Sequence, residues 1–214
     1  MGKVVAIEHV TLDGVMQAPG NPEEDPRGGF RHGGWASRHQ DPAMQEVMSR
    51  HMSGAWSLLA GRTTYEQFAS YWPAQPPNPF SEALGRARKY VASTTLTEPL
   101  AWEHSVLLAG DAADAVSRLK EELPENLVVF GSGVLVRSLL SRDLVDTLVL
   151  LVYPLVLGSG RRLFPDSGAD LGSGSDLGSG SDLGSGSDLR DFRLVESAAT
   201  GTGVIITVYR PAGR

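Results

Sequence analysis

The chain has 214 residues, and its 41% hydrophobic and 21% charged content is typical of a globular protein with one sizeable core, so we expect a single domain over residues 1–214. A formal net charge of −6 argues against nucleic acid or an anionic membrane as the main partner, because both select basic surfaces. The absence of cysteine excludes disulfides, thiolate metal sites and cysteine nucleophiles, and no signal peptide or transmembrane span stands out, so we expect a cytoplasmic protein without a metal site.

The first predicted element is a buried strand from Val4 to Val10, which ends in a turn at Asp13-Gly14. Residues 17–41 follow and are rich in glycine, proline and charge. Long irregular segments of compact domains are usually functional lids or disordered. We favour a lid whose aromatic side chains fold over a planar ligand, and the alternative is a surface loop pinned by Trp35. The aromatic residues in question are Phe30, His32 and Trp35.

A helix is predicted to begin at Asp41-Pro42, with aspartate as the N-cap and proline as the first helical residue. Its apolar face consists of Met44, Val47, Met48 and Met52. We interpret this stripe as core packing rather than as a substrate pocket.

Residues 55–60 form the second predicted strand, which turns at Gly61-Arg62-Thr63 into a helix ending near Trp72-Pro73. Backbone N–H groups at a helix start lack intrahelical partners and attract anions. Arg62 is suited to pair bidentately with a phosphate and Thr63 to donate a hydrogen bond, whereas a surface salt bridge is the alternative role of Arg62. The prolines of residues 73–79 indicate a rigid connection.

The third predicted strand covers residues 89–92 and delivers Ser93, Thr94 and Thr95 at its C-terminal end. Three consecutive hydroxyl side chains suit a phosphate, although a hydroxyl-rich turn explains them equally well. A short strand over residues 105–109 and a helix over residues 111–123 come next.

Residues 127–140 are predicted to form a strand, a tight turn at Gly131-Ser132-Gly133 and a helix. This turn is either a second anion site or a plain bend. The apolar run 146–153 is predicted to be a strand buried on both faces. Alternating strands and helices indicate a largely parallel sheet with helices on both faces, and Gly61, Ser93 and Gly131 then follow strand ends, where ligands bind in such sheets.

Residues 170–187 are three copies of Asp-Leu-Gly-Ser-Gly-Ser, which offer almost nothing to bury and are expected to behave as a flexible insertion in a loop. Two further strands, over residues 192–199 and 203–209, are predicted to form an antiparallel C-terminal hairpin.

Four short motifs lie at the ends of predicted strands. They are Leu12-Asp13-Gly14, Gly61-Arg62-Thr63-Thr64-Tyr65-Glu66, Val129-Phe130-Gly131-Ser132-Gly133 and Pro154-Leu155-Val156-Leu157-Gly158-Ser159-Gly160-Arg161-Arg162-Leu163-Phe164. Each motif is weak alone, but together and in this order they resemble the dihydrofolate reductase fold. Within it, the chain is similar to bacterial dihydrofolate reductase-like proteins related to the reductase domain of riboflavin-biosynthesis deaminase-reductases. The eight predicted strands of the mostly parallel sheet and the four predicted helices follow the order of that fold, and the resemblance implies a homodimer.

The resemblance further implies that NADPH binds across the strand ends. Residues placed on its phosphates are Gly61, Arg62 and Thr63, with Ser93, Thr94 and Thr95 near the 2′-phosphate beside Arg62. Residues placed on the pyrophosphate are Gly131, Ser132, Gly133, Val134 and Leu135. Asp13 and Gly14 lie against the nicotinamide. A cation at Arg62 favours NADPH over NADH, because the extra phosphate is a dianion.

The chain is therefore expected to be an NADPH-dependent reductase that transfers hydride to a small substrate of the pterin or flavin-precursor kind. Asp13 is the preferred proton donor, and Glu46, His32 and Tyr153 are the other candidates. Trp35, Gln45 and Tyr153 are expected in the substrate pocket, although Gln45 is neutral where folate reductases place a carboxylate. Two alternatives are an ordinary Rossmann dehydrogenase, disfavoured because Val136 replaces the third glycine, and a non-catalytic nucleotide-binding or interaction protein that keeps the fold.

Overall fold

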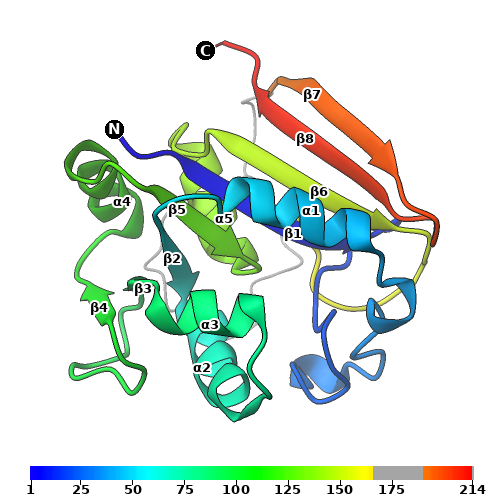
Figure 1. Ribbon diagram of the computed structural model, residues 1–214, viewed down its shortest axis with the longest axis horizontal. Helices are drawn as coiled ribbons and strands as arrows, with labels where there is room; N and C mark the ends of the chain where they lie inside the picture. Colours follow the sequence, from blue (N-terminus) through cyan, green and yellow to red (C-terminus); the bar gives the residue numbers. More distant parts are fainter. Residues whose placement is uncertain (166–189, 214) are drawn as a thin grey trace.

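A computed structural model describes residues 1–165 and 190–213 of the chain. It contains one eight-stranded sheet in the order β4-β3-β2-β5-β1-β6-β8-β7 (Figure 1). The strands are β1 (Val4–Thr11), β2 (Trp56–Gly61), β3 (Lys89–Ala92), β4 (Ser105–Leu108), β5 (Asn126–Phe130), β6 (Thr147–Tyr153), β7 (Phe192–Ala199) and β8 (Ile205–Pro211). The first six pair in parallel, whereas β6–β8 and β7–β8 are antiparallel, so the predicted parallel sheet with a closing hairpin is confirmed.

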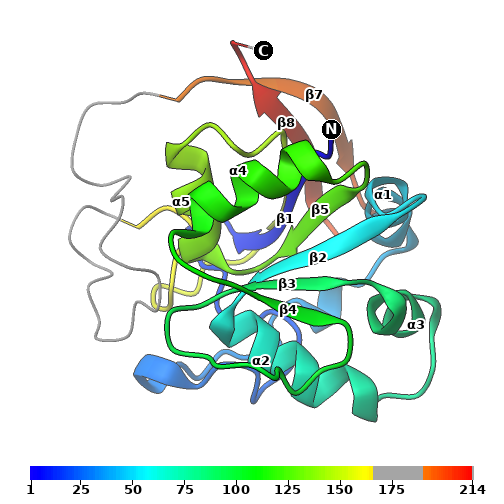
Figure 2. The same cartoon turned by 90° about the vertical axis from the view of Figure 1, so that its left-hand side faces the viewer.

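Helices cover both faces of the sheet, as Figures 1 and 2 show. On one face, α4 and α5 pack side by side, and α1, α2 and α3 flank the other. The α-helices are α1 (Pro42–His51), α2 (Arg62–Tyr71), α3 (Pro79–Arg86), α4 (Ala112–Glu122) and α5 (Gly133–Ser141), and three short 3₁₀ turns are Arg27–Gly29, Ser37–His39 and Trp72–Ala74. The C-terminal ends of the parallel strands therefore lie at one edge of the sheet, where α2 and α5 begin.

Strand β1 lies in the middle of the sheet because its side chains suit burial on both faces. Val4, Ala6 and Val10 pack on the side of α4 and α5, and Val5 and Ile7 pack on the opposite side. In a strand, alternate side chains point to opposite faces. A buried acid, Glu8, interrupts this apolar pattern.

Helix α3 corrects the expectation of four helices, because the described residues contain five α-helices. The proline-rich connection was predicted only as a rigid link. Instead, Asn78 caps the helix that begins at Pro79: its side-chain oxygen accepts from the backbone N–H groups of Phe80 and Ser81, and the Ser81 hydroxyl accepts from the Asn78 N–H. Asparagine followed by proline is an N-terminal helix signal that the sequence did contain.

The helix predicted from Asp41 is confirmed, because the Asp41 carboxylate accepts from the Ala43 N–H at the start of α1. The methionine stripe on this helix divides in two. Met44 is buried in the core together with Val47, as expected, but Met48 and Met52 line the cavity described below. The repeat at residues 170–187 lies outside the described residues, so its expected flexibility stays a prediction.

Candidate functional site

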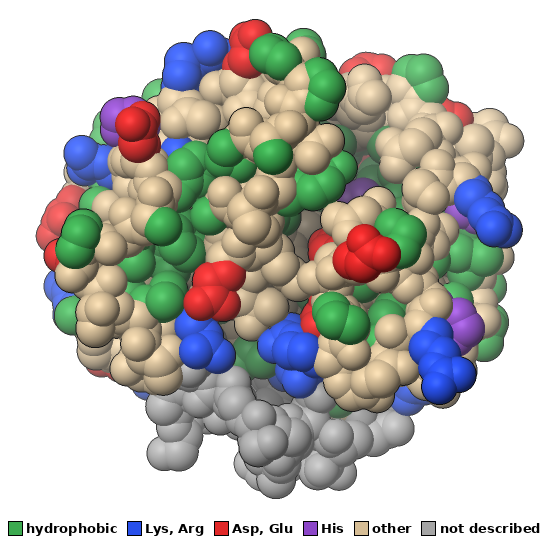
Figure 3. All heavy atoms as spheres, turned by 90° about the horizontal axis from the view of Figure 1, so that it is seen from below, with side chains coloured by type: hydrophobic (Ala, Val, Ile, Leu, Met, Phe, Trp, Pro, Cys, Tyr) green, Lys and Arg blue, Asp and Glu red, His purple; other side chains and the backbone are tan. Residues whose placement is uncertain are grey.

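A cavity of about 850 Å³ opens at the C-terminal ends of the parallel strands. It is walled by the ends of β1, β2 and β5, by the first turns of α2 and α5, and by side chains of α1, α3 and the loop after β1. Figure 3 shows a hollow on the underside of the molecule, with lysine or arginine side chains along one rim. Its volume lies within the range of small-molecule sites.

The two glycine turns meet in this cavity. The Gly61 backbone N–H donates to the Ser132 hydroxyl oxygen at 3.0 Å, which joins the start of α2 to the start of α5. Gly131 and Ser132 both adopt left-handed backbone conformations, with φ of 59° and 57°, and this turns the chain sharply from β5 into α5. Two helix N-termini without side-chain caps therefore border one cavity, an arrangement that favours anionic groups.

All eight residues predicted at these two turns line the cavity: Gly61, Arg62, Thr63, Gly131, Ser132, Gly133, Val134 and Leu135. The third segment predicted to bind phosphate lies elsewhere. Ser93, Thr94 and Thr95 are not among the lining residues, and the Ser93 hydroxyl accepts from the backbone N–H groups of Thr95 and Leu96. Arg62 nevertheless reaches this turn, donating to the Thr95 hydroxyl at 3.1 Å. The hydroxyl-rich segment therefore supports Arg62 from outside the cavity wall.

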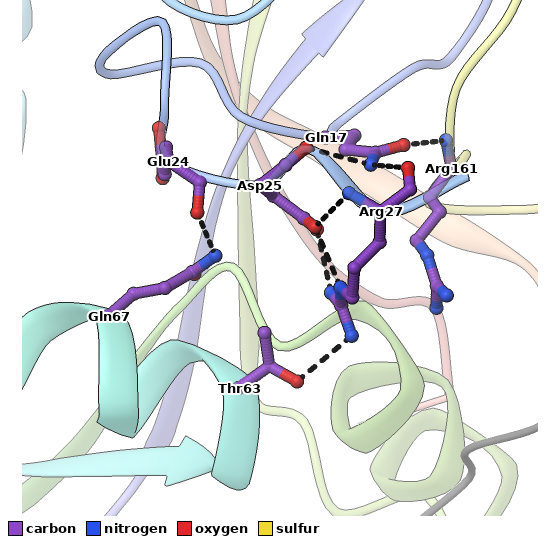
Figure 4. Close-up of polar contacts among 7 residues, drawn as sticks. All are labelled: Gln17, Glu24, Asp25, Arg27, Thr63, Gln67 and Arg161. Carbon is purple, nitrogen blue, oxygen red and sulfur yellow. Dashed lines mark hydrogen bonds and ion pairs between the residues drawn. The ribbon is translucent and has the colours of Figure 1, made fainter. Parts of the chain in front are cut away.

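The loop over residues 17–41 is tied across the cavity by a polar network centred on Gln17 (Figure 4). The Gln17 amide donates to the carbonyls of Asp25 and Arg27 at 3.0 and 2.9 Å and accepts from the Arg161 N–H at 2.9 Å. The loop also touches α2, where Arg27 donates to Thr63 at 3.1 Å and Gln67 donates to the Glu24 carbonyl. The ends of the loop and the first turn of α2 are thus connected.

Arg27 is the basic residue of this loop that lines the cavity. It forms an ion pair with Asp25 at 2.6 Å. Burial acts to raise the pKa of Asp25, but the hydrogen bonds and charge of the Arg27 guanidinium hold that pKa below its ordinary value. Four further arginines line the same cavity, namely Arg62, Arg137, Arg161 and Arg162. The local surroundings of the cavity are therefore cationic, although the chain as a whole is acidic.

The structure does not place the aromatic side chains of the loop in the cavity wall. Phe30, His32 and Trp35 are not among the residues that line the cavity, which the loop lines instead with Gln17, Glu24, Asp25 and Arg27. Trp35 is 8% exposed, donates its indole N–H to the Gln17 carbonyl at 2.7 Å and packs edge-on against Tyr153. Trp35 therefore pins the loop, which was the alternative explanation.

Asp13 has structural contacts that explain its position. Its carboxylate accepts from the Thr11 hydroxyl at 2.6 Å and from the backbone N–H groups of Leu157 and Gly158 at 3.2 and 2.8 Å. Burial acts to raise the pKa of Asp13, but these hydrogen bonds lower it below its ordinary value. Asp13 does not line the cavity. An ionised carboxylate that fastens a loop is a poor proton donor.

Of the other two residues expected in the substrate pocket, Gln45 and Tyr153, the structure places one in the cavity wall. Gln45 lines the cavity, as expected. Tyr153 is fully buried behind the wall, and its hydroxyl pairs with His9 Nδ1 at 2.7 Å. His9 itself lines the cavity, and burial lowers its pKa to about 4. The imidazole is therefore neutral at physiological pH, and Tyr153 orients it.

Sequence reasoning missed Glu8, which lines the cavity beside His9. Its side chain is 1% exposed, and neither carboxylate oxygen has a hydrogen-bond partner within the described residues. Burial raises the pKa of Glu8 well above its ordinary value. The signal was an acid that follows four consecutive apolar residues, Val4 to Ile7, inside a buried strand, because acids are seldom fully buried without a partner or a function.

Neither a cluster of metal ligands nor a membrane-spanning helix is found in the part of the chain that the structure describes. Residues 1–165 and 190–213 contain no cluster of three or more histidine, aspartate or glutamate side chains positioned to hold a metal ion. None of the helices over these ranges is both long and apolar enough to cross a membrane.

Several solved structures share this fold. A putative riboflavin biosynthesis protein from Shewanella sp. PV-4 is 20% identical, with a TM-score of 0.67 and 98% coverage of both chains. A pyrimidine reductase-like protein from Corynebacterium diphtheriae is 14% identical, with a TM-score of 0.60, covering all of this chain and 93% of the other. Dihydrofolate reductase from Enterococcus faecalis, complexed with NADP(H), is 13% identical, with a TM-score of 0.55 and coverage of 99% and 97%.

Sequence comparison identifies relatives and a family. The uncharacterized protein YyaP of Bacillus subtilis is 24% identical over 161 residues, which is 73% of this chain and 77% of YyaP. YwjB of the same organism is 28% identical over 108 residues, or 50% of this chain and 58% of YwjB. The sequence model of the RibD C-terminal domain matches residues 3–206. With this match and the sheet order described above, the chain belongs to the RibD C-terminal domain family.

Proposed function

We propose that the protein is an NADPH-dependent reductase that acts on a small substrate. The observation that carries the proposal is the convergence of two uncapped helix N-termini on one cavity, joined by the hydrogen bond from Gly61 to Ser132. Family membership and the reductase names of the structural neighbours support the same class of activity. The neighbour from Enterococcus faecalis contains NADP(H) in a related fold.

The residues of the cavity fit a dinucleotide in a definite way. Backbone N–H groups in the first turns of α5 and α2 are suited to the pyrophosphate, since they have no intrahelical acceptors. Arg62, braced by Thr95, is suited to the 2′-phosphate. The remaining wall includes the neutral side chains of His9, Met48 and Met52, beside which a planar ring and a substrate would fit.

The cofactor supplies a hydride when it is bound, and the chain supplies binding and orientation. The loop over residues 17–41 excludes water from one side of the cavity, because Gln17, Arg27 and Gln67 fasten it to its neighbours. Holding both reactants in one water-poor cavity accounts for a large part of the rate enhancement in such enzymes.

The direct test is a fluorescence titration of the full chain with NADPH and NADH. We expect NADPH to bind more tightly, and we expect Arg62→Ala to weaken NADPH binding about tenfold or more while NADH affinity changes less, because a charge-assisted phosphate contact is lost. Arg118→Ala, which alters an exposed arginine on α4, is the matched control. Undetectable binding at millimolar NADPH, or an unchanged affinity in Arg62→Ala, contradicts the proposal.

Activity is tested by following NADPH oxidation with pterins, flavin precursors, quinones and carbonyl compounds. Reduction of any of them distinguishes an enzyme from a nucleotide-binding protein that keeps the fold. NADPH binding without turnover of any acceptor would favour the non-catalytic alternative.

A further inference from the structure

The unpaired acid in the cavity wall is the feature that the proposed function does not use. Glu8 follows Ile7 near the C-terminal end of β1, and Ile7 is in register with Phe130, the residue before Gly131. On the other side, Glu8 is in register with the apolar Leu150 of β6. Because Ala6 and Val10 face α4 and α5, Glu8 shares that face of the strand. The acid therefore lies beside the glycine turn that opens α5.

Within residues 1–165 and 190–213, no charged side chain pairs with the Glu8 carboxylate. Burial is the cause of its raised pKa. Arg137 of α5 is directed to the backbone, donating to the Arg162 and Leu163 carbonyls at 3.4 and 3.1 Å. The other ionisable residues of the wall are His9 on β1, Glu24, Asp25 and Arg27 on the loop, Arg62 on α2, and Arg161 and Arg162 after β6.

A buried carboxyl group without a partner is much more stable in its neutral form. In that form it is a hydrogen-bond donor as well as an acceptor. An ionised Glu8 would instead add a negative charge to a cavity whose proposed occupant carries a pyrophosphate and a 2′-phosphate. Like charges in a water-poor cavity repel strongly, so the two states of Glu8 differ in their ability to accept a dinucleotide.

We propose that Glu8 is a proton-linked recognition residue of the dinucleotide site: the protonated carboxyl group accommodates the anionic ligand, and its ionisation opposes binding. The inference rests on the proposed function, since it takes NADPH as the occupant. By reciprocity, bound NADPH holds the proton on Glu8 more tightly than the empty cavity does. If only the protonated form binds, the apparent affinity falls about tenfold per pH unit above the Glu8 pKa of the free protein.

The first measurement follows Glu8 itself. In the full chain labelled with ¹³C at the glutamate Cδ, the Glu8 resonance is identified by its absence from Glu8→Gln. We expect the chemical shift of a protonated carboxyl at neutral pH in the free protein, and a higher titration midpoint after saturation with NADPH. An ionised Glu8 at neutral pH, or a midpoint that NADPH leaves unchanged or lowers, overturns the proposal.

The second measurement is the NADPH dissociation constant from mildly acidic to mildly alkaline pH. Glu8→Gln keeps the shape and a hydrogen-bond donor but cannot ionise, so we expect it to match the wild type at low pH and to bind more tightly once Glu8 of the wild type titrates. Titration of the 2′-phosphate itself, near pH 6, affects both proteins equally. Parallel pH profiles across the range in which the NMR signal shows Glu8 ionising would overturn the proposal.

Controls separate Glu8 from other groups. Glu24 also has a pKa raised by burial, but it accepts hydrogen bonds from the Gly20 and Asn21 N–H groups. Because Glu24 also lines the cavity, the control is Glu121→Gln, at an exposed position of α4 outside the cavity, which is expected to keep the wild-type pH profile. If Glu8→Gln does not fold, Glu8→Leu serves as the second non-ionisable variant. Failure of the wild type to bind NADPH at any pH counts against the proposed function and the linkage, whereas the NMR titration of the free protein still reports the state of Glu8.

Discussion

In the described part of the chain, three charged residues are 4% exposed or less, and their surroundings differ sharply. Lys89 donates to the carbonyls of Gly85, Ala87 and Glu103, and burial lowers its pKa to about 8. Lys120 forms a 2.6 Å ion pair with Asp146. Glu8 has neither kind of partner within the described residues. The two lysines are thus satisfied structurally, which singles out Glu8 as the residue whose burial needs a functional explanation.

The raised pKa of Glu8 predicts a pH-dependent stability. The folded protein holds this proton above the ordinary value of 4.5, at which the unfolded chain releases it, so stability is fully present below 4.5 and falls as pH rises toward the folded pKa. The limiting slope is about 1.4 kcal/mol per pH unit. Urea unfolding at a series of pH values should show this loss in the wild type and in Glu46→Gln, an exposed control, but not in Glu8→Gln. Identical slopes in all three would contradict the prediction.

Asp13 is predicted to act in stability rather than in proton transfer. Asp13→Ala leaves the Leu157 and Gly158 N–H groups without their acceptor, and we expect a loss of about 1–3 kcal/mol in the free energy of unfolding. Denaturant unfolding measures the loss, and NADPH titration in the same variant should give nearly wild-type affinity. A variant of unchanged stability that had lost only its turnover would restore Asp13 as the proton donor.

At the scale of elements, the cavity depends on where helices begin. The first turns of α2 and α5 face one another because Gly61 donates to Ser132 across the ends of β2 and β5. Between them, the left-handed Gly131 brings its backbone close to Thr64, and an added Cβ would lie 3.5 Å from the Thr64 hydroxyl. That distance is an ordinary van der Waals contact, so the left-handed backbone conformation, with a φ of 59°, is what favours glycine at this position.

Helix α3, which was not among the predicted helices, offers a test of its N-terminal cap. Asn78→Ala removes the capping box and should lower the free energy of unfolding by about 0.5–2 kcal/mol. Because Asn78, Pro79, Phe80 and Ala83 line the cavity, NADPH affinity is also expected to fall modestly. Arg118→Ala, at an exposed position of α4, is the control. An Asn78→Ala protein as stable as the wild type would show that the cap contributes nothing.

At the scale of the whole molecule, the sheet has two unlike edges. Strand β4 ends one edge, and β7 ends the other, exposed along nearly its whole length (Figure 1). Three large apolar side chains near the β7 edge are exposed: Leu194 by 50%, Val195 by 42% and Ile205 by 42%. An edge strand with apolar side chains is a surface on which another chain can pair.

The homodimer implied by the resemblance is therefore predicted to use the β7 edge. A two-fold axis brings the same patch of each copy together, so apolar residues on β7 would meet in the interface. Light scattering should give twice the chain mass for the wild type and a monomer for Leu194→Asp/Val195→Asp. Val156→Asp, an exposed apolar position on the loop after β6, should remain a dimer. A monomeric wild type at high concentration would contradict the prediction.

The sequence alone was enough for the order and type of most elements and for both glycine turns. Apolar periodicity, an N-cap at Asp41 and glycines after strands are local signals, and the backbone responds to them locally. The two turns at Gly61-Arg62-Thr63 and Gly131-Ser132-Gly133 were predicted at one edge, because parallel strands bring their C-terminal ends together. Val134 and Leu135 were expected there from the resemblance to the dihydrofolate reductase family.

Only the tertiary structure decided what the side chains of the site do. Whether Trp35 covers a ligand or pins a loop depends on Gln17 and Tyr153, and whether Asp13 is free depends on Leu157 and Gly158, far along the chain. The role of Glu8 depends on its neighbours in β5, β6 and α5, which provide no hydrogen-bond partner for its carboxylate. A local sequence pattern does not contain this information. Burial and hydrogen bonding are properties of neighbours in space, and the fold alone brings those neighbours together.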